Sequence, residues 1–251
     1  MKSLFVYKRA TFFQIDMIKL VITCEHATNA IPYFLLDLFA PYQMDLVAHQ
    51  GYDIGALSIA KAIAINFADF YIFAEYSRLV VDLNRSLHHP KLFSPLIKAL
   101  NKQIKDEILQ SYYFPYRKKV EEEIENMISE GHKVIHLSMH SFTPVLNDRV
   151  RDADFGLLYD PRRKYENKFC RLWKKDIKKI ASNLKVRMNY PYQGKSDALV
   201  TYLRKQFKAD CYIGIELEVN QKFFLRPETF EGDISACILN SFKATLHDFA
   251  F

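Results

Sequence analysis

The sequence predicts an α/β fold, a single domain spanning residues 1–251 in which helices flank a mixed, mostly parallel sheet. First, apolar runs that suit strands alternate with amphipathic stretches that suit helices. Second, three of the apolar runs end in polar residues, as expected where strands of a covered sheet expose their carboxyl ends in a crevice. Third, 251 residues with 49% hydrophobic content can bury the core of one large domain.

The first half of the chain begins with a strand and a helix and ends in a largely helical region. Its predicted elements are a strand at 19–24, a helix at 53–67, strand candidates at 70–75 and 78–83, and helical stretches at 95–110 and 115–131. The apolar positions that recur with helical period in the first helix are Ala56, Ile59, Ala60, Ile63 and Phe67. Pro115 stands early in the last stretch and Gly131 at its end, positions typical of helix boundaries.

The second half continues the alternation of strands and helices. Its predicted elements are a strand at 133–140, a turn-rich segment at 143–152, a strand at 155–160, a helix at 165–184, a strand with its loop at 186–196, a helix at 198–207, a strand at 211–219 and a closing helix at 232–247. Pro161 ends the strand before it, because proline cannot donate to a sheet. The order is that of one α/β domain, without internal repeats or low-complexity linkers.

Glycine usage argues against a nucleotide-binding fold. The chain has 7 glycines, and none forms a GxGxxG or GxxxxGK[ST] motif. Gly194-Lys195-Ser196 resembles the end of a phosphate loop but lacks its first glycine, so a mobile substrate loop is the better interpretation. The net charge of +6 arises from 35 basic residues interleaved with 29 acidic ones, which suits a small anionic ligand as well as nucleic acid.

The cysteines and the apolar stretches predict the compartment. The four cysteines, at positions 24, 170, 211 and 237, show no CxxC spacing. Residues 1–17 lack the uninterrupted apolar region of a signal peptide. Charges interrupt every apolar run well before the ~20 residues that span a bilayer. We therefore expect a cytoplasmic protein with reduced thiols and no membrane segment.

Four residues carry side chains suited to metal-assisted hydrolysis, which needs metal ligands, an open position for water and a carboxylate that moves protons. His26 and His140 each follow or end an apolar run, so both imidazoles are expected near the same sheet edge. Asp53 and Glu218 add carboxylates. Taken singly, a histidine at a strand end is often structural, and Asp53 at a predicted helix start could be a simple N-cap.

The run RLVVDLNR adds side chains suited to an anion. The planar guanidinium of Arg85 can bind a carboxylate through two hydrogen bonds, and Asn84 beside it adds a second donor. Asp82 could orient Arg85. The ordinary alternative for Arg85 is a surface ion pair.

These residues belong to motifs that resemble the N-formylglutamate amidohydrolase family. The motifs are CEHATNAIP, HQGYDIGA, SRLVVDLNRS, LSMHSF, NYPYQGKSDALVTYLR and IELEVNQKFF, in the family's order from about Val21 to Phe224. The resemblance implies a fold related to zinc carboxypeptidases and aspartoacylases. It also implies that Asn84-Arg85 binds a substrate carboxylate, that His140-Ser141 ends a strand at the metal, and that Glu218 is the catalytic acid and base.

The resemblance leaves two assignments open. Carboxypeptidases supply two zinc ligands as HxxE, whereas Asn29 stands three positions after His26, so Asp53 of YDIG is the preferred second ligand and Glu25 the alternative. Glu216 and Glu218 point to the same face of one strand, since side chains alternate. The family's ExN element favours Glu218 as the base, and the carboxypeptidase pattern favours Glu216.

The expected activity is hydrolysis of a small anionic N-acyl amino acid, by resemblance N-formylglutamate to formate and glutamate. The resemblance predicts one divalent ion, with zinc expected, held by His26, Asp53 and His140. Arg78 is a weaker second clamp for substrate carboxylate, and Lys195 is a further candidate contact. The alternatives are a non-catalytic protein that binds an anion or nucleic acid on the same fold, and a carboxypeptidase-like hydrolase with another acyl substrate. No RNA-binding signature supports nucleic acid, and the oligomeric state stays open.

Overall fold

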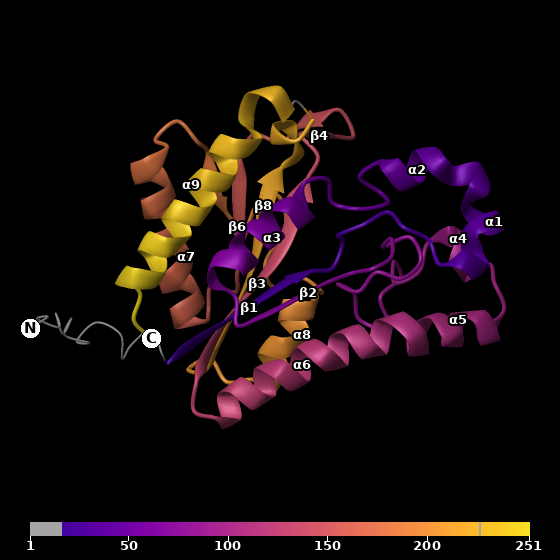
Figure 1. Cartoon of the computed structure of the whole chain (residues 1–251), viewed down its shortest axis with the longest axis horizontal. Helices are drawn as coiled ribbons and strands as arrows, with labels where there is room; N and C mark the ends of the chain where they lie inside the picture. The colour runs from indigo at the N-terminus through magenta and orange to yellow at the C-terminus, as the bar shows by residue number, and fades with distance from the viewer. Residues whose placement is uncertain (1–16, 226) are drawn as a thin grey trace, which may run out of the picture.

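The computed structural model describes residues 17–225 and 227–251, and its centre is a six-stranded sheet (Figure 1). The strand order is β2-β1-β3-β8-β6-β7. The strands are β1 (Ile18–Cys24), β2 (Phe70–Phe73), β3 (Lys133–Phe142), β6 (Phe155–Leu158), β7 (Val186–Met188) and β8 (Tyr212–Asn220). Every neighbouring pair is parallel except β6 with β8. The predicted α/β fold with a mixed, mostly parallel sheet is confirmed, whereas its extent as a single domain over 1–251 stays a prediction.

Helices cover both faces of this sheet. Helices α3 (Ala56–Phe67), α7 (Lys164–Ile180) and α9 (Pro227–Asp248) lie on one face, while α6 (Phe114–Ser129) and α8 (Leu199–Gln206) lie on the other (Figure 1). Rings of Trp173 in α7 and Phe242 in α9 pack 5.1 Å apart, which joins these two helices over the sheet. The central strands β3 and β8 are therefore buried almost along their whole length.

Shorter elements project from the ends of the sheet. These are η1 (Tyr33–Leu35), α1 (Leu36–Phe39), η2 (Ala40–Tyr42), α2 (Gln43–Val47), α4 (Pro95–Lys98), α5 (Lys102–Ile108), a π-helical turn at Leu109–Tyr113, the hairpin β4 (Val145–Leu146) with β5 (Arg149–Val150), and η4 (Gln221–Phe223). The helical stretch predicted at 95–110 is divided, because the Asn101 side chain accepts from the Ile104 backbone at 3.0 Å and starts α5 anew.

The strand predicted at 78–83 is wrong. The segment forms turns, although Val80 and Val81 are buried as strand residues would be. The Ser77 hydroxyl accepts from the Leu79 backbone at 3.2 Å, and Asp82 Oδ1 accepts from the Asn84 backbone at 3.0 Å. Such local bonds from serine and aspartate compete with sheet pairing, so the run enters the core without joining the sheet.

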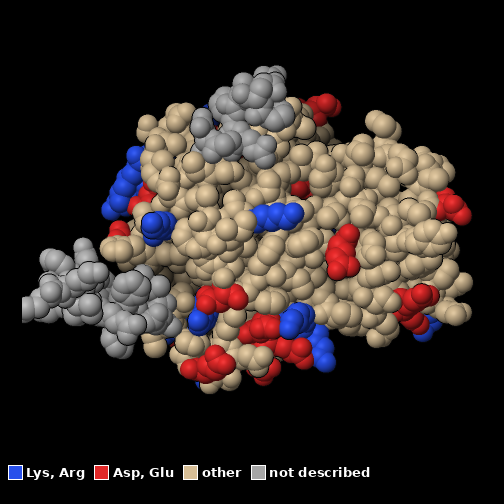
Figure 2. Space-filling model, in the orientation of Figure 1, with Lys and Arg blue, Asp and Glu red and all other residues tan. Residues whose placement is uncertain are grey.

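Surface charge bears on nucleic-acid binding, and helix length bears on the expected lack of a membrane segment. Acidic and basic side chains lie side by side along the lower edge of the face in Figure 2. Lys119 pairs with Glu123 in α6. No continuous basic stripe marks that face. Among the described residues, none of the helices combines the length and apolarity that crossing a membrane needs.

A buried histidine in β3 supports a testable stability prediction. His136 is fully buried and hydrogen-bonds Thr23 Oγ1 and the Tyr212 hydroxyl, both at 2.8 Å. Burial lowers its pKa from 6.5 to about 4, so the folded protein holds the neutral ring while the unfolded chain takes up a proton. As pH falls from 6.5 to 4, wild type should lose about 3 kcal/mol of unfolding free energy relative to His136→Gln, measured in urea at each pH.

The exposed His88 offers the matched control for this measurement. His88→Gln should follow the wild-type pH profile. Parallel profiles for wild type and His136→Gln would contradict the prediction.

Candidate functional site

Polar side chains from three neighbouring strands meet at the carboxyl edge of the sheet. Glu25 and His26 follow directly after β1, and His140 of β3 lies opposite Glu218 of β8 in the strand register. All four side chains are buried. Because β1, β3 and β8 run parallel, residues more than 100 positions apart come together at this edge.

His26, Asp53 and His140 form a compact group, the candidate metal group. Asp53 Oδ2 lies 3.3 Å from His26 Nδ1 and 2.8 Å from His140 Nδ1. Potential ligand atoms of the three side chains all lie within 4.8 Å of one another. Two imidazole nitrogens and one carboxylate oxygen suit a divalent ion such as zinc and leave a coordination position open.

The backbone places Asp53 for this role. Its N–H donates to the carbonyl of His26 at 2.9 Å, which ties the segment before α3 to the end of β1. Helix α3 begins at Ala56, and its N-cap is Gly55 at φ 83°, so Asp53 is not the N-cap. A side chain at position 55 would be strained there and would collide with the ring of Phe224.

The far nitrogen of each imidazole is also held. His26 Nε2 lies 2.7 Å from Asp82 Oδ1. His140 Nε2 lies 2.9 Å from Ser138 Oγ and 3.3 Å from Glu25 Oε2. Metal-binding histidines commonly donate this second N–H to a carboxylate or similar acceptor, which fixes the ring. Both rings thus present Nδ1 to Asp53, and Glu25 lies behind His140 rather than among the Nδ1 atoms.

The electrostatics of the group suit a cation. Burial opposes ionisation of Asp53, yet His26 and His140 outweigh it and hold the pKa of Asp53 well below its usual range. Burial likewise opposes ionisation of Glu25, but the hydrogen bond and charge of His140 lower its pKa to about 2. The pKa of His140 is raised well above its ordinary value, because the hydrogen bonds of Asp53 and Glu25 outweigh burial. A divalent ion at this position would compensate these buried negative charges.

Glu218 differs from these carboxyl groups. Burial raises its pKa to about 8, and the charge of His140 opposes this shift. Its Oε2 has no hydrogen-bond partner among the described residues. Glu216 is instead held, since its Oε1 accepts from Asn84 Nδ2 at 3.1 Å. A buried carboxyl with a free oxygen and a raised pKa is a candidate for proton transfer.

The candidate substrate residues of the 78–85 segment are engaged to different degrees. Arg78 pairs with Asp82 Oδ2 at 2.8 Å and with Asp53 Oδ1 at 3.4 Å, so it supports both carboxylates. The Asn84 amide also accepts from the Leu199 backbone at 2.7 Å, so it positions its neighbours. Arg85 donates from Nη1 to the carbonyl of Asp197, whereas its Nε has no hydrogen-bond partner among the described residues. Arg85 therefore keeps the most capacity for a ligand.

Lys195 lies elsewhere. Its exposed side chain lines a different hollow, together with Asp160, Thr201 and basic residues just before α7 and in α8. None of the hydrogen bonds and ion pairs within 17–225 and 227–251 joins Lys195 to the candidate metal group.

Two supporting roles were not predicted from the sequence. Asp82, expected to orient Arg85, lies 3.8 Å from Arg85 Nε, and it also contacts His26 at 2.7 Å and Arg78 at 2.8 Å. Ser138 was not predicted, although it lies two positions before His140 on the same strand and therefore on the same face. That spacing is the signal that could have identified it.

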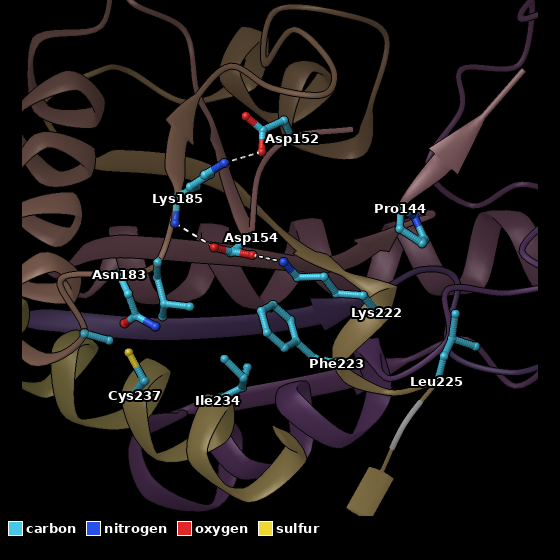
Figure 3. A pocket seen from close by; sticks show the side chains of 12 residues that line it. Pro144, Asp152, Asp154, Asn183, Lys185, Lys222, Phe223, Leu225, Ile234 and Cys237 are labelled. Carbon is cyan, nitrogen blue, oxygen red and sulfur yellow. Dashed lines mark hydrogen bonds and ion pairs between the residues drawn. The ribbon is translucent and has the colours of Figure 1, made fainter. Parts of the chain in front are cut away.

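A hollow of about 790 Å³ is lined by none of the residues of the candidate metal group (Figure 3). Figure 3 shows Lys185 reaching Asp152 and Lys222 reaching Asp154 above Phe223. Both lysines of this hollow are therefore paired with an aspartate. Burial raises the pKa of the Cys237 thiol on its wall, which makes the thiol less reactive. We assign it no part in the chemistry.

Comparisons with known proteins support the family resemblance and the fold. The family model described as N-formylglutamate amidohydrolase matches residues 18–225. A gene product of Agrobacterium tumefaciens has a similar structure, with a TM-score of 0.76 at 24% identity over 91% of this chain and 90% of that one. An N-formylglutamate amidohydrolase from Ralstonia eutropha JMP134 gives a TM-score of 0.67 at 18% identity over 90% of this chain and 93% of that one. No curated protein matches the sequence.

Proposed function

The chain belongs to the N-formylglutamate amidohydrolase family, and on this premise we propose that it hydrolyses the amide bond of a small N-acyl amino acid with the help of one divalent metal ion. N-formylglutamate is the substrate we propose first, with formate and glutamate as products. The observation that carries the proposal is the convergence of His26, Asp53 and His140, whose ligand atoms lie within 4.8 Å of one another. The hydrogen bonds that fix Nε2 of both histidines, to Asp82 and to Ser138, support it.

The proposed chemistry divides between the metal and the protein. When bound, a divalent ion such as zinc supplies positive charge that polarises the scissile carbonyl and makes water more acidic. Glu218 accepts a proton from water as the water oxygen attacks the formyl carbon, and it delivers that proton to the departing nitrogen. A C–O bond forms, the C–N bond breaks, and the products are formate and the free amine of glutamate. Positive charge beside Glu218 favours its carboxylate over the neutral form that burial favours.

Arg85 is the residue we propose for the substrate carboxylate. Its side chain is 27% exposed, and it lies 3.8 Å from Asp82, which itself contacts His26. A guanidinium in this place can bind the α-carboxylate and present the adjoining amide to the metal group. Asn84 and Arg78 position the groups around it.

Metal analysis and a substrate panel test the proposal. Protein purified without chelators or metal-affinity steps should contain, or take up, about one zinc or similar ion per chain and should release formate and glutamate from N-formylglutamate. N-acetylglutamate, N-formylaspartate and N-formylmethionine distinguish another amidohydrolase, which would prefer one of these. Failure to bind any divalent ion together with failure to hydrolyse the panel would overturn the proposal in favour of a non-catalytic anion-binding protein.

Arg85→Met should raise KM for N-formylglutamate by about 100-fold and change kcat by less than about threefold, because a charged two-point contact contributes to binding before and during reaction. Steady-state kinetics with N-formylglutamate and with its α-amide measure the effect. The α-amide lacks the carboxylate, so wild type and variant should treat it alike. Arg187→Met, which removes an exposed arginine, is the control. Equal losses on both substrates would contradict the carboxylate role.

A further inference from the structure

A hollow of about 450 Å³ lies between the start of α7 and helix α8, and it shares no residue with the candidate metal group. We call it the basic hollow, and the residues that line it are Asp160, Arg162, Arg163, Lys195, Thr201, Arg204 and Lys205. Five of the seven are cationic. Its volume suits a small ligand rather than a protein surface.

The cations of the basic hollow are not balanced by the carboxylates around them. Asp160 pairs with Arg162 at 2.8 Å, and buried Glu166 behind the wall pairs with Arg163 and Arg204. Lys195 and Lys205 form no ion pair with any residue of the described chain. Five positive charges thus face two negative ones, which leaves an excess of three.

Two of the arginines are fixed rather than mobile. The side chain of Arg204 is only 6% exposed, with Nε 3.0 Å from Glu166 and Nη2 donating to the Gly214 carbonyl at 2.6 Å. Arg163 is 14% exposed and donates to the Tyr212 carbonyl at 2.9 Å. Because these and further backbone bonds engage their guanidinium donors, Arg163 and Arg204 contribute fixed positive charge to the wall, while the exposed Lys195 and Lys205 supply donors for an anion.

We propose that the basic hollow binds a small oxyanion carrying at least two negative charges, with the chemistry of a phosphate ester or pyrophosphate. A single carboxylate would compensate only part of the excess charge, whereas a phosphate group offers several acceptor oxygens to donors from different directions. None of the lining residues is aromatic, so the hollow offers no surface on which nucleic-acid bases could stack.

The basic hollow adjoins the loop that supports Arg85. Lys195 is followed two positions later by Asp197, whose carboxylate accepts from the Ser86 backbone at 2.9 Å and whose carbonyl accepts from Arg85. Thr201 of the hollow donates to the Ser196 carbonyl at 2.6 Å. An anion held by Lys195 therefore contacts the same loop that holds the candidate substrate arginine.

Pyrophosphate binding tests this site, measured by isothermal titration of the full chain at 0.15 M salt, where screening over about 8 Å suppresses distant charges. Wild type should bind one pyrophosphate per chain. The double variant Lys195→Gln, Lys205→Gln should bind at least about tenfold more weakly, since two unpaired donors are lost. Both side chains are exposed, so the fold should be retained, which the melting temperature checks.

A matched double variant separates a built site from general positive charge. Lys174→Gln, Lys175→Gln removes the same charge from a neighbouring hollow lined by α7, and it should change affinity by less than about threefold. Arg85→Met and Asp53→Asn, which alter the candidate active site and its metal affinity, should also leave pyrophosphate binding within about threefold. No binding by wild type at millimolar pyrophosphate, equal weakening by both lysine pairs, or loss of binding in either active-site variant would overturn the proposal.

Discussion

Asp53→Asn is expected to abolish stoichiometric metal uptake and to lower kcat/KM for N-formylglutamate by at least about 10³-fold, because a metal ion contributes several kcal/mol to such reactions. Asp53 Oδ2 is the atom that both histidines face, at 3.3 and 2.8 Å. The amide keeps the size of the side chain but removes the negative charge between the two imidazoles. Elemental analysis after zinc loading and gel filtration, run beside steady-state kinetics, measures both effects.

Two further variants make this result specific. Asp154→Asn neutralises a buried carboxylate that binds Lys222 and the Lys185 backbone and, within the described chain, forms no hydrogen bond or ion pair with the candidate metal group. This variant should keep its metal and its activity. Glu25→Gln alters the acceptor behind His140 and should weaken metal binding by roughly 10 to 100-fold, the range for residues that support a ligand. Full metal occupancy in Asp53→Asn with loss of metal in Glu25→Gln would instead make Glu25 the ligand.

The sequence indicated the edge of the sheet where the candidate site lies, because neighbouring parallel strands always end at the same edge. His26 and His140 end apolar runs, and parallel pairing of β1 with β3 brings two such ends together whatever lies between them. Spacing left Glu25 open as an alternative to Asp53, and the identity of the second ligand stays a prediction. The contacts that favour Asp53 are a backbone bond from Asp53 to His26 and the place of Glu25 beside His140 Nε2, neither of which spacing shows.

The wrong strand prediction at 78–83 has an identifiable physical origin. The run at 78–83 has the composition of a strand, and Val80 and Val81 are indeed buried. Serine and aspartate side chains at 77 and 82 satisfy the backbone locally, so burial does not require sheet pairing. The same turns bring Asp82 to His26, a contact that a straight strand would not predict. Hydrophobic pattern therefore identified what is buried, while polar side chains decided the backbone path.

Glu218→Gln should lower kcat by about 10³-fold with little change in KM, since removing a general acid and base typically costs 10²- to 10⁴-fold. The variant should retain its metal, because Glu218 is outside the group formed by His26, Asp53 and His140. Steady-state kinetics and metal analysis of the same preparation measure these two properties.

The unfolding temperature of Glu218→Gln shows whether a lower kcat reflects lost catalysis or a destabilised fold. Burial raises the pKa of Glu218 from 4.5 to about 8 in the metal-free protein, so the stability associated with its neutral form is present below 4.5 and lost as pH rises through 8. Glutamine stays neutral at every pH, so metal-free Glu218→Gln should unfold at an equal or higher temperature than metal-free wild type at pH 8.

Glu216→Gln is the matched control, and its loss of kcat should be less than about tenfold because Glu216 is held by Asn84. A larger loss in Glu216→Gln would transfer the proton-transfer role to Glu216, and full activity in both variants would contradict carboxylate catalysis from β8.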